Sequence, residues 1–165
     1  TSHEEVPVEP ELDWSDWTPL ESFEETEDPR LQETGVYQVR LVRDGEPVTI
    51  PRWLGEDEDG LIYVGKGQIK TRLKKFRDGI DDHGKFHSAG RKRYLLKRWV
   101  PAYQNRFGGL TRECRWAATD ERKPKVVEKD LLHPYVQRFG EAPPLNGAFA
   151  YRKRPDIWED RYGTK

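Results

Sequence analysis

The sequence predicts a mixed α/β domain in which short strands alternate with helices along the chain. Three segments have the residue pattern of strands: 36–42, 61–66 and 112–118. Three others repeat their apolar positions every three or four residues, as helices do: 69–80, 91–103 and 125–139. The 165 residues are 34% hydrophobic and 36% charged. This composition indicates one domain with a small core and a highly charged surface.

The first two strands are expected to pair as an antiparallel hairpin, the simplest arrangement for neighbouring strands. In residues 36–42, Tyr37 falls on the more apolar face. Residues 61–66 place Tyr63 on the same face as Leu61. Between these strands, the residues up to Gly60 form a long connection that begins at a turn, Asp44-Gly45.

The helix that follows is basic outside its apolar stripe. The stripe has spacings of four, three and four residues: Ile69, Leu73, Phe76 and Ile80. A second helix over 91–103 should be distorted near its end by Pro101. In the third strand, Cys114 and Trp116 face the same side. The last helix should be kinked or divided by Pro134.

Charge divides the chain into an acidic arm, a basic body and a tail. Residues 1–33, the acidic arm, carry twelve acidic side chains and one basic one, whereas the rest carries eighteen acidic and twenty-eight basic ones. We therefore divide the chain into the arm, a body over 34–150 and a basic, aromatic tail over 151–165. A basic body suits a protein that binds phosphates, because each neutralised phosphate releases counterions.

The arm has two readings. It is either a solvated leader or a segment that covers the basic body and competes with nucleic acid. Disordered tails rarely contain the apolar side chains found here, which are Trp14, Trp17, Leu20 and Phe23. We therefore expect residues 12–23 to pack on the body.

Some cellular contexts fit the sequence poorly. The single cysteine, Cys114, precludes an internal disulfide and fits a reducing compartment. No apolar run approaches the roughly 18 residues of a membrane span, and the first residues lack the pattern of a signal peptide. We expect a cytoplasmic protein with no membrane partner.

Candidate site residues surround two glycine–tyrosine strings, Gly35-Val36-Tyr37 and Tyr63-Val64-Gly65. A carboxylate among apolar residues, such as Glu128, must be paired, hydrated or bound to a metal if it is buried. The alternative is an exposed glutamate paired with Lys125. Arg72 begins the basic helix, and a guanidinium suits a phosphodiester because it makes two directed hydrogen bonds. By default, strand tyrosines are half-buried residues with the hydroxyl in water.

Taken in this order over residues 35–146, these residues resemble the GIY-YIG nuclease family, and its restriction and homing endonucleases most of all. The resemblance implies a three-stranded antiparallel sheet flanked by helices. It also implies one divalent ion, Mg²⁺ or Mn²⁺, surrounded by Tyr37, Tyr63, Arg72, Glu128 and Asn146. In this analogy Glu128 holds the metal, Arg72 steadies the scissile phosphate and Tyr37 helps to remove a proton from the attacking water. Lys66 matches a lysine that some members carry after the second motif.

Two departures from the family pattern are visible. Phe76 stands where many members have a histidine or tyrosine, so the proton relay falls to His87 first and to His83 second. The 25 residues between Tyr37 and Tyr63 resemble the stretched hairpin of the restriction enzymes, in which Arg52-Trp53 could contact DNA. Other basic residues are expected to bind the DNA backbone: Lys70, Lys74, Lys75, Arg77, Arg91, Lys92 and Arg93.

The sequence thus leads us to expect a divalent-metal-dependent endonuclease that hydrolyses phosphodiester bonds in double-stranded DNA. A restriction or defence role and a homodimer are further expectations. Three alternatives differ in class: a catalytically inactive nucleic-acid-binding module, a nuclease toxin restrained by its acidic arm, and a solvated structural domain with an accidental resemblance.

Overall fold

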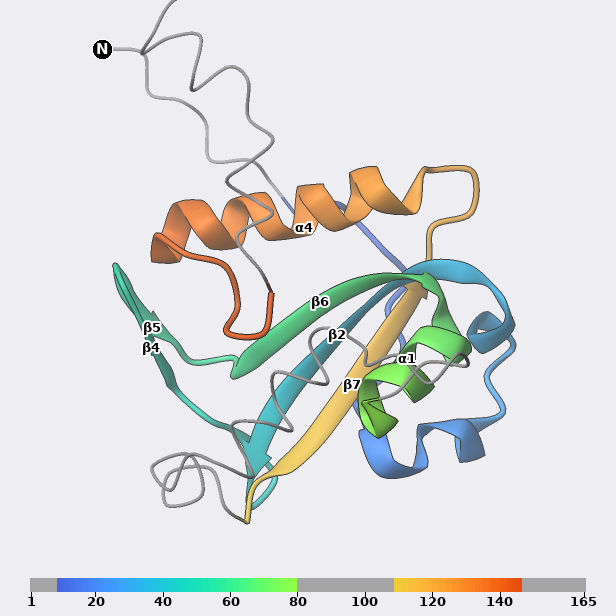
Figure 1. Cartoon of the computed structure of the whole chain (residues 1–165), viewed down its shortest axis with the longest axis horizontal. Helices are drawn as coiled ribbons and strands as arrows, with labels where there is room; N and C mark the ends of the chain where they lie inside the picture. The colour runs from blue at the N-terminus through green and yellow to red at the C-terminus, as the bar shows by residue number, and fades with distance from the viewer. Residues whose placement is uncertain (1–8, 80–108, 147–165) are drawn as a thin grey trace, which may run out of the picture.

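The computed structural model describes residues 9–79 and 109–146, and the fold below refers to these residues. Their centre is an antiparallel sheet with helices on both faces (Figure 1). Strand β2 (Thr34–Arg43) lies between β6 (Leu61–Gln68) and β7 (Thr111–Ala118). Two short strands extend the sheet: β1 (Thr18–Pro19) beside β7, and β3 (Glu46–Pro47) beside the end of β2. The predicted mixed α/β class and the antiparallel pairing of the first two strands are confirmed.

One predicted strand face is wrong, because β6 is irregular. The pairing of β2 with β6 shifts register between Val39 and Arg40, so that Val39 faces Tyr63 and Arg40 faces Leu61. A shift of this kind moves the side chains beyond it to the other face of a sheet. Tyr63 accordingly packs with the apolar cluster on the α1 side, whereas Leu61 packs with the cluster under α4.

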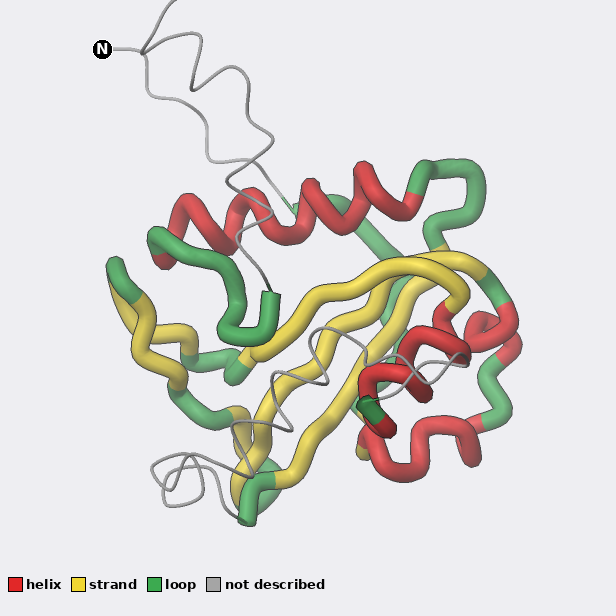
Figure 2. The backbone as a smooth tube through the Cα atoms, viewed as in Figure 1, coloured by secondary structure: helices red, strands yellow, loops and turns green. Residues whose placement is uncertain are grey.

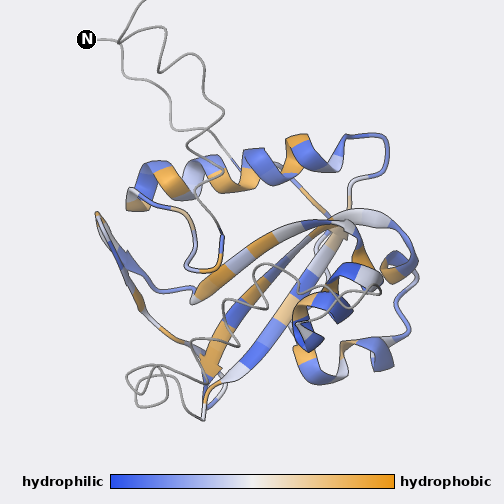
Figure 3. Ribbon diagram, viewed as in Figure 1, coloured by the Kyte–Doolittle hydropathy of each residue, from blue (hydrophilic) through white to orange (hydrophobic). Residues whose placement is uncertain are grey.

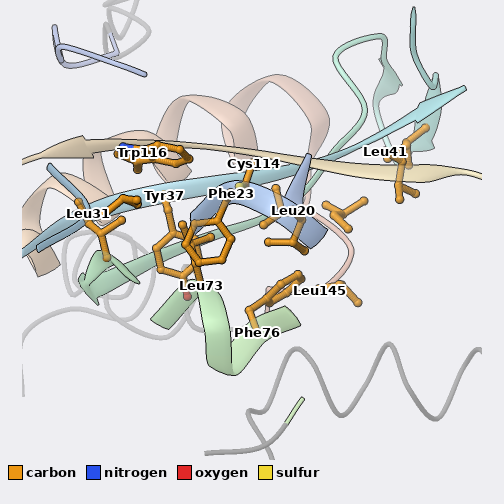
Figure 4. Close-up of a cluster of buried hydrophobic side chains, with 14 residues drawn as sticks. Leu20, Phe23, Leu31, Tyr37, Leu41, Leu73, Phe76, Cys114, Trp116 and Leu145 are labelled. Carbon is orange, nitrogen blue, oxygen red and sulfur yellow. The ribbon is translucent and has the colours of Figure 1, made fainter. Parts of the chain in front are cut away.

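Helix α1 (Ile69–Asp78) covers one face of the sheet. It begins after Gln68, whose side chain accepts a hydrogen bond from the Thr71 amide at 2.7 Å and so caps the first turn. The first three positions of the predicted apolar stripe, Ile69, Leu73 and Phe76, are buried. The fourth position, Ile80, lies outside the described residues. Figure 4 shows the cluster that this stripe joins between the sheet and α1, which includes Tyr37, Leu73, Phe76, Cys114 and Trp116.

Helix α4 (Pro124–Phe139) covers the other face (Figure 3). Its buried residues include Val127, Leu131 and Leu132, which pack on Val36, Val64 and Ala117 of the sheet. Pro134 lies inside the helix and does not divide it, contrary to one of the two expectations for this residue. Buried side chains before Pro134, such as Leu131, and after it, Tyr135 and Phe139, hold both halves of the helix against the rest of the protein. This packing compensates for the backbone hydrogen bond that a proline cannot donate.

The long connection between β2 and β6 contains a small hairpin of its own. Strands β4 (Ile50–Arg52) and β5 (Gly55–Asp57) pair with each other and dock on the end of α4. The Leu54 amide donates to the Phe139 carbonyl at 3.0 Å. Arg52 pairs with Glu141 and donates to the Ala142 carbonyl at 2.7 Å. The tip residue Trp53 remains 80% exposed.

The acidic arm packs on the body from Leu12 onward, as predicted. After β1 it forms two short 3-10 helices, η1 (Leu20–Thr26) and η2 (Pro29–Gln32), which lie beside α1 (Figure 2). Leu20 and Phe23 are completely buried in the cluster of Figure 4. Glu21 pairs with Arg112, and Glu24 pairs with Arg77 at 2.8 Å. The described part of the arm is therefore built into the core.

A ladder of alternating arginines and tryptophans also ties the arm to the sheet. Arg40 lies 4.1 Å from the ring centre of Trp17, and Arg115 lies 4.8 Å from Trp17 and 4.3 Å from Trp14. Cation–π contacts of this kind contribute about 0.5–2 kcal/mol each, more when they are desolvated. The ladder sits on the α4 side of the sheet, whereas Leu20 and Phe23 pack on the α1 side.

Some predictions lie outside the described residues, namely the helix over 91–103 and the tail over 151–165. Within the described ranges, no helix is both long enough and apolar enough to cross a membrane.

Replacing one arm residue tests whether the arm belongs to the core. Phe23→Ala should lower the free energy of unfolding by about 3–5 kcal/mol, because it empties a fully buried aromatic site. Leu54→Ala, at a position that is 62% exposed, is the control and should change it by less than about 0.5 kcal/mol. Urea unfolding followed by far-UV circular dichroism measures both. Equal stability of the two variants would show that the arm is a detachable cover.

Candidate active site at the edge of the sheet

Five of the predicted site residues converge at strand β6, which lies at the edge of the sheet. They come from four elements: Tyr37 from β2, Tyr63 and Lys66 from β6, Arg72 from α1, and Glu128 from α4. Their mutual proximity is seen in their pKa values: Arg72 acts on Tyr37, Tyr63 and Glu128, and Lys66 acts on Glu128. Segments up to about ninety residues apart in the sequence therefore meet at one place.

The two tyrosines are positioned by close packing. Their ring centres lie 5.9 Å apart, and Tyr63 stacks on Phe76 with a centroid distance of 5.1 Å and an angle of 12°. Tyr37 is completely buried, with its ring against the backbone of Gly65. A Cβ atom at Gly65 would lie 2.3 Å from the Tyr37 hydroxyl oxygen. The position of the Tyr37 ring therefore requires a glycine at position 65.

A second glycine makes room for the arginine. Gly67 has a φ of +127°, and a Cβ atom there would lie 2.8 Å from the Cγ of Arg72. The aliphatic part of Arg72 therefore lies on bare backbone, a close approach that glycine permits. Its positive charge opposes the rise in the pKa values of Tyr37, Tyr63 and Glu128. Among the residues that the structure describes, Arg72 alone acts on all three.

Burial keeps both phenols protonated at neutral pH. It raises the pKa of Tyr37 well above the ordinary value near 10, with Tyr63 adding to the effect and Arg72 opposing it. The pKa of Tyr63 is also raised, first by burial and then by the negative charge of Glu128. The Tyr37 hydroxyl is buried and interacts with the side chains of Tyr63 and Arg72.

Glu128 is buried, being only 9% exposed, so the alternative of an exposed surface glutamate is wrong. Burial raises its pKa, whereas the positive charges of Lys66, Arg72 and Lys125 lower it. The effect of burial is the larger. A carboxylate in this condition is stabilised by any further cation that it can reach.

The donor set fits a magnesium site only if one carboxylate is enough. Within residues 9–79 and 109–146, no three histidine, cysteine, aspartate or glutamate side chains gather as a metal cage. Mg²⁺ retains several waters and commonly binds through one or two carboxylates together with substrate phosphates. Glu128 meets that requirement.

Asn146 lies beside the same edge, and its amide is engaged with the main chain. Its Oδ1 accepts from the Val64 amide at 3.0 Å, and its Nδ2 donates to the Val64 carbonyl at 2.9 Å. The Leu145 amide donates to the Ile62 carbonyl at 2.9 Å. Asn146 thus occupies the main-chain hydrogen-bonding groups of Val64 that a further strand beside β6 would otherwise use. Its role around a metal remains a prediction.

The basic residues predicted to contact DNA differ in their surroundings. Lys74 is exposed, and Lys70 and Lys75 are partly exposed on α1. Arg77 is held by Glu24, Asp78 and the ring of Phe23, and Arg52 is held by Glu141. The remaining candidates lie outside the described residues: His83, His87, Arg91, Lys92 and Arg93. Their roles remain predictions.

A cavity lies farther along α4, lined in part by Gln38, Arg115 and Trp17, and it was not predicted. Polar residues that alternate along a strand usually face water, so the pattern carried no sign of a cavity. The pairing of Phe76 with Tyr63 was also missed, although their places on a strand and on the helix after it were predicted.

Comparison with known proteins adds nothing to this description. No family model, curated protein or solved structure matches the chain.

The raised pKa of Glu128 leads to a stability test. Because folding raises this pKa, the folded protein binds the proton more tightly than the unfolded chain does, and the charged carboxylate destabilises the fold at neutral pH. Glu128→Gln should therefore raise the melting temperature at pH 7, and the gain should disappear as the pH falls through the raised pKa toward pH 4. Scanning calorimetry across that range measures it.

Asp130→Asn, at an exposed acidic residue on the same helix, is the matched control and should leave the melting temperature nearly unchanged. A lower melting temperature for Glu128→Gln at pH 7 would mean that the attraction to Lys66 and Arg72 outweighs burial.

Proposed function

We propose that this protein is a divalent-metal-dependent endonuclease of the GIY-YIG type that hydrolyses phosphodiester bonds in double-stranded DNA. One observation carries the proposal: Tyr37, Tyr63, Lys66, Arg72 and Glu128 meet at one edge of an antiparallel sheet. These are residues that the resemblance names, and they come together from four separate elements. An accidental match in the sequence would have no reason to converge in space.

The charges of this group suit a phosphodiester that is being cleaved. Arg72 would bind the scissile phosphate, because its guanidinium makes two directed hydrogen bonds and stays charged. Lys66 would add a second positive charge beside it. Negative charge grows on the phosphate and the leaving oxygen during attack, and fixed cations nearby stabilise that charge.

Glu128 would hold one Mg²⁺ or Mn²⁺ ion. When bound, such an ion supplies positive charge to the phosphate oxygens and the leaving group. The carboxylate needs no second acidic residue for this, because waters and phosphate oxygens complete the coordination of Mg²⁺.

The tyrosines would position and deprotonate the attacking water. The Tyr37 hydroxyl interacts with Arg72, so it would hold the attacking water beside the phosphate that Arg72 binds. To accept a proton, Tyr37 must first be ionised, and its raised pKa makes this rare at neutral pH. Arg72 favours the ionised form. Tyr63 would hold the ring of Tyr37 in place through their mutual contact.

The alternatives are an inactive nucleic-acid-binding module and a toxin restrained by its arm. A module without activity has no use for a buried carboxylate that destabilises the fold at neutral pH. A toxin restrained by its arm requires the arm to leave the body, and the complete burial of Leu20 and Phe23 disfavours this. A restriction or defence role and a homodimer belong to the proposal as further expectations.

Cleavage of supercoiled plasmid tests the proposal directly. With Mg²⁺, the wild-type protein should nick or linearise the plasmid, and EDTA should stop it. Glu128→Gln should abolish cleavage while DNA affinity stays near normal. Arg72→Ala should reduce the rate by about 10²–10³-fold, the loss typical when a group that stabilises a transition state is removed.

Asp130→Asn is again the control and should cut at the wild-type rate. Mg²⁺-dependent cutting by Glu128→Gln would contradict the metal assignment. DNA binding by the wild-type protein with no cutting under any divalent ion would favour the inactive module.

The pH dependence of cleavage tests the role of Tyr37. If the phenolate accepts the proton, kcat/KM should rise about tenfold per pH unit between pH 7 and pH 9, since the pKa of Tyr37 lies above this range. Tyr37→Phe should lose this rise together with most of the activity. It should fold normally, because it keeps the buried ring and removes only the hydroxyl. A rate independent of pH in the wild-type protein would exclude the phenolate.

A further inference from the structure

A cavity of about 680 Å³ lies apart from the tyrosine cluster, between the sheet and the second half of α4. Its size falls within the range of small-molecule sites, roughly 300–1,000 Å³. The lining residues that matter here are Trp17, Gln38, Arg40, Arg115, Tyr135 and Phe139. It occupies the part of the sheet where the apolar contact with α4 gives way to polar side chains.

Gln38 offers two hydrogen-bond donors to this cavity. It is only 5% exposed, and its Oε1 accepts from Arg115 Nε at 2.8 Å. Because Arg115 can only donate, this contact fixes which end of the Gln38 amide is the oxygen. Its NH₂ group makes no hydrogen bond to another described residue, and the side chain lines the cavity. The two N–H donors are therefore available to a ligand there.

Arg115 supplies further donors beside Gln38. Trp14 and Trp17 pack against its guanidinium, and only its Nε donates within the described part of the chain. Arg40, in contrast, is paired with Glu113 at 2.7 Å. Burial lowers the pKa of Arg115, Glu9 opposes this, and Arg40 adds to the lowering. The terminal nitrogens of Arg115 are therefore donors held in place by stacking.

Three acidic residues line the cavity: Glu9 and Asp59, which are exposed, and Asp57, which is buried. Asp57 is 1% exposed and already accepts from the Asp59 amide at 2.9 Å, the Leu61 amide at 3.3 Å and the Tyr135 hydroxyl at 2.7 Å. The protein's own donors thus occupy its carboxylate. The cavity presents donors from the sheet and aromatic surfaces from Trp17, Tyr135 and Phe139.

From this arrangement we infer that the cavity binds a nucleobase whose ring carbonyl accepts from Gln38 and Arg115 while its flat face packs on the aromatic side chains. Thymine, uracil, guanine and cytosine have such a carbonyl, whereas adenine has none. Enzymes that take a base out of its stack read it in this way, by hydrogen bonds to its edge and by stacking.

The inference rests on the proposed function where it concerns DNA. Tyr135 follows Glu128 by seven residues, which is two helical turns or about 10 Å along the same side of α4. Stacked nucleotides along one strand are about 3.4 Å apart, so the cavity lies roughly three steps from the carboxylate. A base unstacked near the cut would reach it.

Binding of free nucleosides tests the cavity without any cleavage. In NMR titrations, thymidine and deoxyguanosine should bind the wild-type protein at least about tenfold more tightly than deoxyadenosine, the difference of one or two hydrogen bonds. Gln38→Glu keeps the acceptor for Arg115 but replaces the two donors with a carboxylate oxygen, and it should abolish this preference. Asp59→Asn, at an exposed position on the rim, should keep it.

A second arm of the test identifies the source of the base. Duplex DNA with one mismatched thymine should bind the Glu128→Gln protein, which is expected not to cut, more tightly than it binds the Glu128→Gln/Gln38→Glu double variant. Equal DNA binding by the two proteins, with nucleoside binding intact, would overturn the DNA part and leave a site for free nucleotides. Equal binding of the three nucleosides to the wild-type protein would overturn the whole inference, whatever the plasmid assay shows.

Discussion

The contact between the Tyr37 ring and the bare backbone of Gly65 determines how the rest of the site is arranged. It allows a fully buried phenol to lie across the neighbouring strand, between the sheet and α1. Tyr63 then fills the space beside it, and Phe76 stacks on Tyr63. In this way the apolar core under α1 and the polar cluster at the edge of the sheet share the same aromatic rings. Loss of this packing would move the candidate site and the core together.

The electrostatics of the site follow from the same burial. Burial excludes water from Tyr37, Tyr63 and Glu128, and all three pKa values rise as a result. Lys66 and Arg72 only partly offset this. The cluster is thus buried by the surrounding fold and also linked by interactions among Tyr37, Tyr63 and Arg72, an arrangement common at functional sites.

Much of this architecture could be predicted from the sequence, because it depends on local periodicity. The alternation around Tyr37, the shared face of Cys114 and Trp116, and the stripe on α1 all follow from spacing alone. The site residues could be named from their order, although their convergence depends on contacts between distant elements. The face of Leu61 could not be predicted, because it depends on a register shift between two strands.

For a related reason, the sequence predicted neither the hairpin of β4 and β5 nor the cavity beside Gln38. Short strands rich in proline, glycine and acidic residues have no clear period, and a polar strand position looks the same whether it faces water or an enclosed space. The division of the last helix at Pro134 was wrongly expected, because local propensity does not include the packing of the helix on both sides of the proline.

The amide of Asn146 has a consequence for self-association. An edge strand exposes main-chain groups that can pair with another molecule, and such pairing leads to aggregation. Here the Val64 amide and carbonyl are occupied by Asn146, and the Ile62 carbonyl is occupied by the Leu145 amide. Two residues after α4 thus protect the middle of β6 from a foreign strand. The protein can keep an edge strand at its candidate site, open to a substrate, without offering that edge as a template for fibrils.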